Sequence, residues 1–233
     1  MAVESIYSLD QYLLTLVNGS DSLFLDSVVP VLTSGLTWIP LYVGLLYLVV
    51  KNNETMAQIG LIVASAVACA ILSGGVDDAI VKPLVARLRP CNDPLVSGQL
   101  DLLPTVVESG YSFFSAHAAN TMSLAVFFCF LVRDKVFDTT MILWSLLNCW
   151  TRLYLGVHYP SDILVGMLYG GVVGGLVYFI SRKIYFKFNA KFHYISSQYT
   201  STGYAKADID VIIAILVITM AVVVIGGVAE VQI

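Results

Sequence analysis

The residues of this sequence best suited to chemistry lie in three short polar stretches beside long apolar segments. They read KPLVARLRP at 82–90, FFSAH at 113–117 and TRLYLGVHYPSD at 151–162. Ionisable side chains at the border of a membrane segment are costly and therefore indicate function. Two of the three histidines in the chain fall in these stretches, together with arginines, a lysine, a serine and an aspartate.

The basic residues of the three stretches predict an anion site. Arg89 and Arg152 offer the forked donors that suit a phosphate group, and Lys82 adds a point charge. Ser115 stands where a helix is expected to begin, and helix N-termini attract anions through free N–H groups. A divalent metal is disfavoured, because three cations surround a single carboxylate. The stretches therefore predict a phosphate pocket without a metal.

Two histidines beside a phosphate suggest that one attacks phosphorus and the other protonates the departing oxygen. Pro160 fits the first turn of a helix, which places Asp162 in that turn and His158 just before it. Asp162 can then accept a hydrogen bond from His158 and leave its other ring nitrogen as the nucleophile. His117 has no such partner nearby in the sequence, which suits a general acid.

The composition is that of an integral membrane protein. Of the 233 residues, 58% are hydrophobic and 12% are charged, against about 25% charged in a soluble domain. The net charge of −4 argues against a nucleic-acid partner. Residues 1–21 lack the basic start of a removable signal peptide, and their apolar positions recur at helical spacing. We expect an amphipathic helix lying in the membrane interface.

The apolar runs predict an all-α, polytopic membrane helical bundle of about six or seven spans. Residues 22–50 are expected to form two short helices that break near Thr33–Gly35, because Pro and Gly weaken a helix there. The core then covers 22–182, a basic and then polar linker covers 183–208, and an additional span covers 209–233. The clearer runs are 56–80, 117–132, 137–152, 160–181 and 210–229.

The basic residues divide unequally between the two sides of this bundle. Lys82, Arg87, Arg89 and Arg152 fall on the side of the polar stretches, and eight fall on the other side. This bias predicts that the polar stretches face the periplasm or the outer surface. The eight are Lys51, Arg133, Lys135, Arg182, Lys183, Lys187, Lys191 and Lys206.

The three stretches resemble the motifs of the type 2 phosphatidic acid phosphatase and haloperoxidase superfamily. KPLVARLRP is similar to its K-x6-R-P element, and TRLYLGVHYPSD to its S/T-R-x5-H-x3-D element. FSAH stands in the place of P-S-G-H, with Phe114 for Pro and Ala116 for Gly. Because Ala tolerates positive φ poorly, we predict that Ala116 is right-handed and helical.

The resemblance implies a metal-independent lipid phosphatase without a cofactor, similar to bacterial undecaprenyl pyrophosphate phosphatases or lipid A phosphatases. It thereby implies a multi-pass protein of the bacterial inner membrane with its active site facing the periplasm. By position it makes His158 the nucleophile, His117 the acid and Asp162 the partner of His158. The phosphate-binding residues that it implies are Lys82, Arg89, Ser115, the backbone N–H of Ala116, and Arg152.

Several residues outside these motifs have simpler interpretations. Arg87 is expected to be solvated or to contact a lipid headgroup, and Asp77 and Asp78 to reach water or to pair with Lys82. Asp26 and the corner at Thr33–Trp38 are weaker candidates for the edge of the pocket. A small-xxx-small pattern predicts close helix packing, with a dimer face as the lesser alternative, at Gly166, Gly170, Gly171, Gly174 and Gly175.

The lipid itself stays open at this stage, as does the oligomeric state. The candidate substrates are undecaprenyl pyrophosphate, lipid A phosphates, phosphatidylglycerol phosphate and phosphatidic acid. The other lipids of the membrane are the expected surroundings of the protein. Two other classes are weighed against a phosphatase. A vanadate-dependent haloperoxidase is disfavoured because that branch is soluble, and a non-catalytic lipid-phosphate binding or transport protein would not need both histidines and Asp162.

Overall fold

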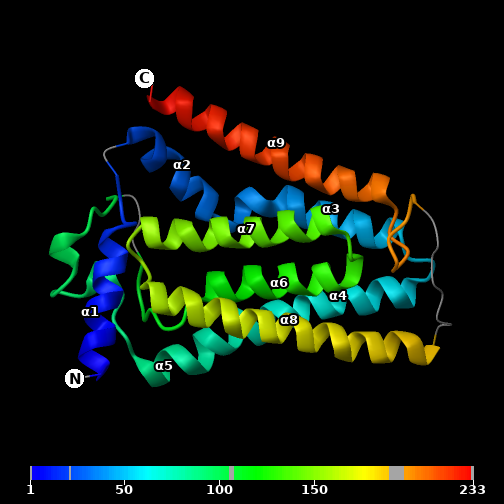
Figure 1. The fold of residues 1–233 in the computed structure, drawn as a ribbon, viewed down its shortest axis with the longest axis horizontal. Helices are drawn as coiled ribbons and strands as arrows, with labels where there is room; N and C mark the ends of the chain where they lie inside the picture. Colours follow the sequence, from blue (N-terminus) through cyan, green and yellow to red (C-terminus); the bar gives the residue numbers. More distant parts are fainter. Residues whose placement is uncertain (1, 21, 105–107, 189–196, 232–233) are drawn as a thin grey trace.

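The protein is an all-helical bundle, as predicted. The computed structural model describes residues 2–20, 22–104, 108–188 and 197–231, and within these ranges it has helices and turns but no β-strand. Figure 1 shows most of the helices running alongside one another, with the long last helix crossing them obliquely.

Three helices of the described chain are long and apolar enough to cross a membrane, and a bent pair makes up to four. The first spans Met56–Val85 and consists of α4 (Met56–Ala70), two π-helical segments and α5 (Lys82–Val85). The others are Pro160–Tyr185, within α8 (Pro160–Phe188), and α9 (Lys206–Val231). The number of six or seven spans stays a prediction.

The predicted break in residues 22–50 is confirmed. Helix α2 (Leu23–Thr33) and the helical stretch Gly35–Lys51, which ends in α3 (Ile39–Lys51), meet at an angle of 68°. Ser34 is extended and its hydroxyl accepts a hydrogen bond from Leu36 N, so one helix ends and the next begins there. The buried Trp38 stabilises the corner, because its indole N–H donates to Leu32 O at 2.9 Å.

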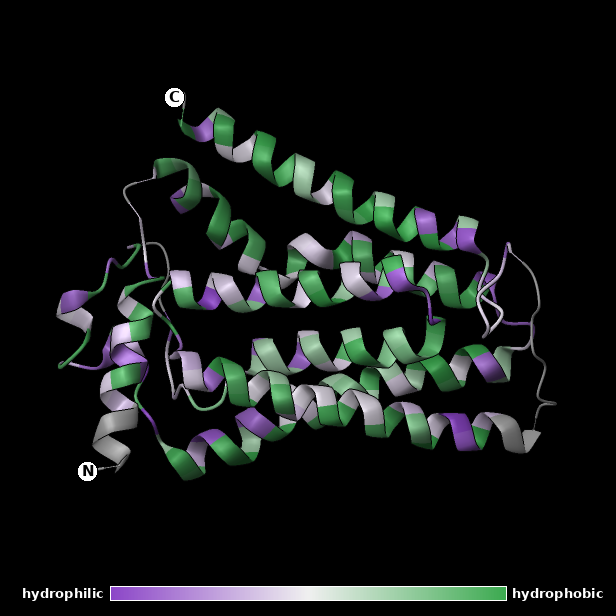
Figure 2. Ribbon diagram, viewed as in Figure 1, coloured by the Kyte–Doolittle hydropathy of each residue, from purple (hydrophilic) through white to green (hydrophobic). Residues whose placement is uncertain are grey.

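Helix α6 (Ala116–Val132) lies in the middle of the bundle. It packs against α4, against α7 (Lys135–Tyr154) and most extensively against α8. Apolar side chains of all four helices form the main core, which α3 and α9 extend. In Figure 2 the helices are mainly green along their length, and the purple hydrophilic residues gather toward the two ends of the bundle.

Small residues of α8 allow the close approach to α6, as the small-xxx-small pattern predicts. A Cβ on Gly170 would lie 2.2 Å from Ala119 O, and one on Gly174 would lie 2.3 Å from Ser123 O. No side chain fits in that space, so glycine is required at both positions. These glycines therefore allow the N-terminal half of α8 to lie directly against that of α6, and both helices carry predicted site residues at their N-terminal ends.

The three polar stretches meet at one end of the bundle (Figure 1). Helix α1 (Ala2–Thr15) crosses that end, beside the loop that follows α5 and the turn between α7 and α8. Lys51, Lys135 and Lys206 lie at the opposite end, where α3 ends and α7 and α9 begin. The separation of the two groups agrees with the division of basic residues predicted from the sequence.

The predicted boundaries of two segments need correction. Helix α8 continues to Phe188 because no Gly or Pro follows Gly175 in this stretch, so Lys183 belongs to the helix rather than to the linker. Likewise, the apolar run predicted at 56–80 continues as a helical span through Lys82 to Val85. Part of the predicted linker, residues 189–196, lies outside the described residues.

Candidate active site

The turn between α7 and α8 presents the predicted nucleophile. Arg152 lies in the last turn of α7, and Gly156 adopts a left-handed φ of +64° that lets the chain reverse. Pro160 then starts α8 and places Asp162 in its first turn. The turn is tightly enclosed, since His158 is 1% exposed and Asp162 is fully buried.

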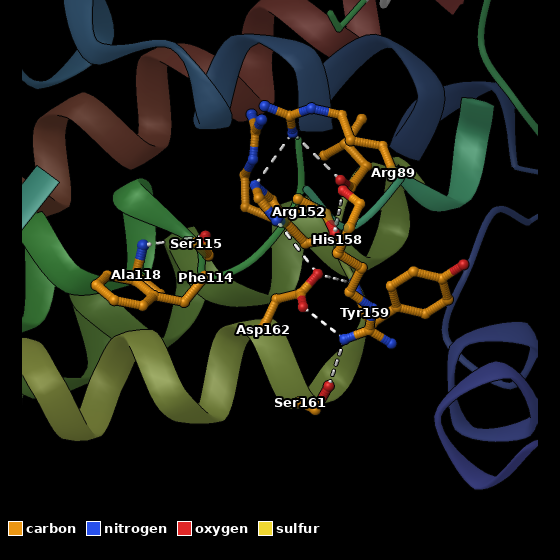
Figure 3. Close-up of polar contacts among 12 residues, drawn as sticks. Arg89, Phe114, Ser115, Ala118, Arg152, His158, Tyr159, Ser161 and Asp162 are labelled. Atoms are coloured by element: carbon orange, nitrogen blue, oxygen red, sulfur yellow. Dashed lines mark hydrogen bonds and ion pairs between the residues drawn. The ribbon is translucent and has the colours of Figure 1, made fainter. Parts of the chain in front are cut away.

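The imidazole of His158 lies between a carboxylate and a guanidinium (Figure 3). Its Nδ1 is 3.6 Å from Asp162 Oδ2, and its Nε2 is 3.2 Å from Arg89 Nη1. Arginine is a donor only, so the arrangement assigns the acceptor role to Nε2 and the proton to Nδ1, which faces Asp162. The separation of 3.6 Å is longer than a hydrogen bond. The two groups are adjacent, but the bond predicted from the sequence is not formed in this state.

Burial sets the protonation state of His158. Burial and the charges of Arg152 and Arg89 lower the pKa of His158, and Asp162 raises it; the net result is a pKa of about 4. The imidazole is therefore neutral near pH 7. A neutral imidazole with an unprotonated Nε2 is the form that a nucleophile requires.

Two buried arginines surround a single acidic group. Arg152 donates from Nη1 to Thr33 Oγ1 at 2.9 Å and from Nη2 to Glu108 Oε1 at 2.5 Å. Arg89 is oriented by the carbonyls of Ser109 and Val157, and its Nη2 lies 3.4 Å from Glu108 Oε2. The two guanidinium groups thus converge on one oxyanion, as they would on a phosphate.

Glu108 was missed from the sequence. An acidic residue in a long loop is ordinarily solvated, and nothing in its neighbours indicates otherwise. Burial raises the pKa of Glu108, but its hydrogen bond to Arg152 and the charges of Arg152 and Arg89 lower it below its usual value overall. Its carboxylate is therefore ionised and forms ion pairs with both Arg152 and Arg89.

Lys82 and His117 are two further predicted site residues, from the first and second stretches. The Lys82 ammonium lies 2.6 Å from Asp78 Oδ1 and 3.3 Å from Asp77 Oδ2, which is the pairing considered from the sequence. The His117 side chain, in the first turn of α6, interacts electrostatically with Arg152, His158, Glu108 and Lys82. The structure therefore brings the predicted site residues of all three stretches to one place.

Ser115 and Ala116 join this site to the start of α6. The Ser115 hydroxyl caps the helix by accepting from Ala118 N at 3.3 Å, and its own N–H donates to Asp162 O at 3.1 Å. Ala116 is the first residue of α6 and right-handed, since only Ala86 and Arg133 have positive φ among the non-glycine residues of the described chain. The prediction for Ala116 is confirmed.

The interpretation of Arg87 as a solvated or headgroup-bound cation is wrong. Its Nη1 donates to Asp162 Oδ1 at 2.7 Å and to Ser161 Oγ at 2.8 Å, and its Nη2 donates to Asp10 Oδ2 at 2.6 Å. Asp10 comes from α1, far away in the sequence. The partner could not be recognised from local spacing because the fold of α1 over the site creates the contact.

The corner between α2 and α3 also belongs to the site. Thr33, a weak candidate from the sequence, holds Arg152 as described above. Asp26 instead accepts from Tyr154 Oη at 2.6 Å. The corner therefore contributes through Thr33, and Asp26 stabilises the end of α7.

A buried neutral histidine, an adjacent carboxylate and a converging pair of arginines form the motif set that resembles the phosphatase and haloperoxidase superfamily. The family model of the PAP2 superfamily matches residues 57–186 of this chain. The chain belongs to the PAP2 superfamily. The matched range contains the three polar stretches, whereas α1, α2, α3 and α9 lie outside it.

Two lipid A 4'-phosphatases are similar to this chain over most of its length. That of Bacteroides thetaiotaomicron is 34% identical over 78% of this chain and 81% of its own length. That of Porphyromonas gingivalis is 29% identical over 76% of this chain and 74% of its own length. The resemblance stated from the motifs is thereby confirmed.

A solved PAP2 structure has the same fold. It is a transmembrane PAP2 type phosphatidylglycerolphosphate phosphatase from Bacillus subtilis, and the two chains superpose with a TM-score of 0.55 at 22% identity. The superposition covers 82% of this chain and 90% of the other. Together with the apolar helices, this likeness identifies a multi-pass membrane protein with a PAP2 fold.

Proposed function

We propose that this PAP2 protein hydrolyses a phosphate monoester from a membrane lipid through a phosphohistidine on His158. The observation that carries the proposal is the position of His158 Nε2, 3.2 Å from Arg89 Nη1. Arg89 also faces the oxyanion that Arg152 binds. A phosphoryl group held by the two arginines would thus lie next to a neutral, buried nucleophile.

In the first step, the Nε2 lone pair of His158 attacks phosphorus and the bond from phosphorus to the lipid oxygen breaks. His117 donates its proton to the departing oxygen, so the lipid leaves as an alcohol. Asp162 faces the Nδ1–H and stabilises the positive charge that develops on the imidazole. Arg89 and Arg152 bind the phosphoryl oxygens in their more negative transition state.

In the second step, water attacks the phosphohistidine. The bond from phosphorus to Nε2 breaks and its electron pair returns to His158. His117, now without its proton, accepts one from the attacking water, so both histidines regain their starting states. The products are inorganic phosphate and the dephosphorylated lipid. Lys82 and the arginines supply the cationic charge, and we therefore expect the reaction to need no metal.

The relatives favour a lipid A substrate. The two lipid A 4'-phosphatases are similar over more than three quarters of this chain, whereas the similar Phosphatidylglycerophosphatase B of Haemophilus influenzae matches over 34% of it. We infer that the scissile group is the 4'-phosphate of lipid A or of a closely related saccharide lipid. The site would then face the periplasm of an inner membrane, with the acyl chains in the bilayer.

The decisive experiment measures phosphate release by detergent-purified protein in EDTA. The panel contains lipid A, undecaprenyl pyrophosphate, phosphatidylglycerol phosphate and phosphatidic acid, and His158→Ala is assayed beside the wild type. We expect release from lipid A that EDTA leaves unchanged and that His158→Ala abolishes. Because the phosphorus–nitrogen bond of phosphohistidine is labile in acid and stable in alkali, alkali-quenched enzyme should carry radioactivity from phosphate-labelled substrate on His158. Release that persists without His158 would overturn the mechanism, and release from another lipid alone would overturn the substrate.

The other two classes predict different results. A lipid-phosphate binding or transport protein would retain the substrate uncleaved, and His158→Ala would leave its affinity nearly unchanged. A haloperoxidase would oxidise bromide in the presence of vanadate, whereas a phosphatase should be inhibited by vanadate. The His158–Asp162 arrangement favours the phosphatase, since simple binding needs no neutral nucleophile beside a carboxylate.

A further inference from the structure

A buried chain of polar contacts leads away from Asp162 on the side opposite His158. Asp162 Oδ2 faces His158 Nδ1 and accepts from Tyr159 N at 2.9 Å, and Oδ1 accepts from Arg87 Nη1 at 2.7 Å. Each oxygen therefore has its own set of partners. The carboxylate can rotate toward or away from His158 only if the bond to Arg87 changes.

Arg87 is itself held from several sides. Its guanidinium lies 3.9 Å from the centre of the Tyr159 ring, which is a cation–π distance. Its Nη1 also donates to Ser161 Oγ. Its Nη2 donates to Asp10 Oδ2 at 2.6 Å, and Asp10 is only 4% exposed. This orientation leaves the guanidinium no freedom to bind substrate phosphate as Arg89 and Arg152 can.

Asp10 is the contact by which α1 reaches the active site. Besides Arg87, it accepts hydrogen bonds from Ser161 N at 2.8 Å and from Ser161 Oγ at 2.5 Å. Ser161 immediately precedes Asp162 at the start of α8. A buried aspartate with three donors is an unusual feature for a helix that only lies in a membrane interface.

We propose that Arg87 is a positioning residue for the His158–Asp162 pair and that Asp10 of α1 holds Arg87 in place. The inference rests on the proposed function, because it concerns the orientation of the proposed nucleophile. The N-terminal helix thus completes the active site rather than serving only as a membrane anchor. Neither residue touches the phosphate, and both act through Asp162.

This role predicts a change in turnover rather than in substrate binding. Without Arg87, the bond from Tyr159 N remains but Asp162 Oδ1 is no longer held, so the carboxylate can turn and His158 loses its orientation toward phosphorus. A misplacement of about 1 Å costs roughly 100-fold in rate, so we expect Arg87→Met to lower kcat by about 10- to 100-fold. KM should stay within about twofold of the wild type, since Arg89 and Arg152 are unchanged.

The pH profile distinguishes positioning from a purely structural role. The charged and titratable groups that face His158 are Asp162, Arg89, Arg152 and His117. Removing the cation that partly neutralises Asp162 strengthens the negative field at His158 and raises its pKa. The acid limb of kcat/KM should therefore move to higher pH in Arg87→Met. Arg87→Lys keeps the positive charge but loses the forked donors of the guanidinium. We therefore expect kcat to fall while the acid limb of kcat/KM stays at the wild-type pH.

Tyr7→Phe is the matched control for the docking of α1. Tyr7 Oη donates to Asp93 and lies on the same helix as Asp10, but it makes no hydrogen bond to Arg87. Asp10→Asn should lower kcat several-fold with KM unchanged, whereas Tyr7→Phe should have the kcat and KM of the wild type. Equal losses in the two variants would mean that helix docking alone matters, which would overturn the role of Asp10.

Parallel assays separate failure of this inference from failure of the proposed function. An active His158→Ala variant would overturn the proposed mechanism whatever Arg87 does. An inactive His158→Ala variant beside Arg87→Lys and Asp10→Asn with wild-type kcat would overturn the positioning role alone. Raised KM with unchanged kcat would make Arg87 a binding residue and also overturn it. Should Arg87→Met not fold, which thermal unfolding in detergent would show, the other two variants carry the test.

Discussion

Glu108 and Arg152 form the shortest ion pair of the active site, with Glu108 Oε1 2.5 Å from Arg152 Nη2. The same carboxylate lies 3.4 Å from Arg89. It therefore occupies the two guanidinium groups that we expect to bind the substrate phosphate. Phosphate and Glu108 cannot occupy both arginines at once, so substrate binding must displace the carboxylate.

Replacing Glu108 by Gln should therefore strengthen phosphate binding. Removing a partly exposed ion pair that competes with the ligand changes the binding free energy by roughly 1 kcal/mol, or about fivefold in affinity. The inhibition constants of vanadate and inorganic phosphate should fall accordingly. Glu108→Asp, which keeps the charge, should remain close to the wild type. Weaker inhibition in Glu108→Gln would mean that Glu108 orients Arg152 and does not compete with phosphate.

Replacing His117 by Gln should affect substrates according to their leaving groups. A sugar hydroxyl leaves poorly without a proton, so kcat on lipid A should fall by about 10²- to 10⁴-fold. The loss should be much smaller on p-nitrophenyl phosphate, whose leaving group departs readily as an anion. The comparison is made by steady-state kinetics on both substrates. An equal loss on both would contradict the role of general acid.

The pH dependence of the free enzyme should show an unusually acidic limb. Because burial lowers the pKa of His158 to about 4, its imidazole stays neutral above that value and is protonated as the pH falls through it. A protonated imidazole cannot attack phosphorus. Therefore kcat/KM, corrected for titration of the substrate, should persist through pH 5 and decline only near pH 4. A midpoint near the ordinary value of about 6.5 would show that His158 is not in this buried state in solution.

The glycines of α8 offer a test of the helix packing beneath the site. In Gly170→Ala the new Cβ would lie 2.2 Å from Ala119 O, and the two helices must separate. Such a clash costs about 1–3 kcal/mol, which should lower the thermal midpoint in detergent by several degrees.

Gly171→Ala provides the control for this test. The nearest atom to its new Cβ is Met122 Cγ at 4.0 Å, an ordinary contact. Its stability should equal the wild type or exceed it by up to about 1 kcal/mol, because alanine favours a helix. Equal midpoints for the two variants would contradict the close approach of α8 to α6.

Much of this protein follows from its sequence alone. Long apolar runs must satisfy their backbone groups internally, so they form helices in any membrane context. The break at Ser34–Gly35, the right-handed Ala116 and the close approach at Gly170 are local consequences of residue type. The motif residues could likewise be expected to form a phosphate site, because Arg, His and Asp at fixed spacing around helix ends have few alternative chemistries.

Only the tertiary structure shows which side chains contact these motif residues. Glu108 lies in a loop and Asp10 in an N-terminal helix, and neither has a local pattern that distinguishes it from a solvated acid. Arg87 is two positions from Arg89, yet one faces Asp162 and the other His158. Contacts of this kind depend on how α1 and the loop fold over the bundle end. Their energy comes from burial and from charge pairing across long sequence separations, and local spacing carries no information about either.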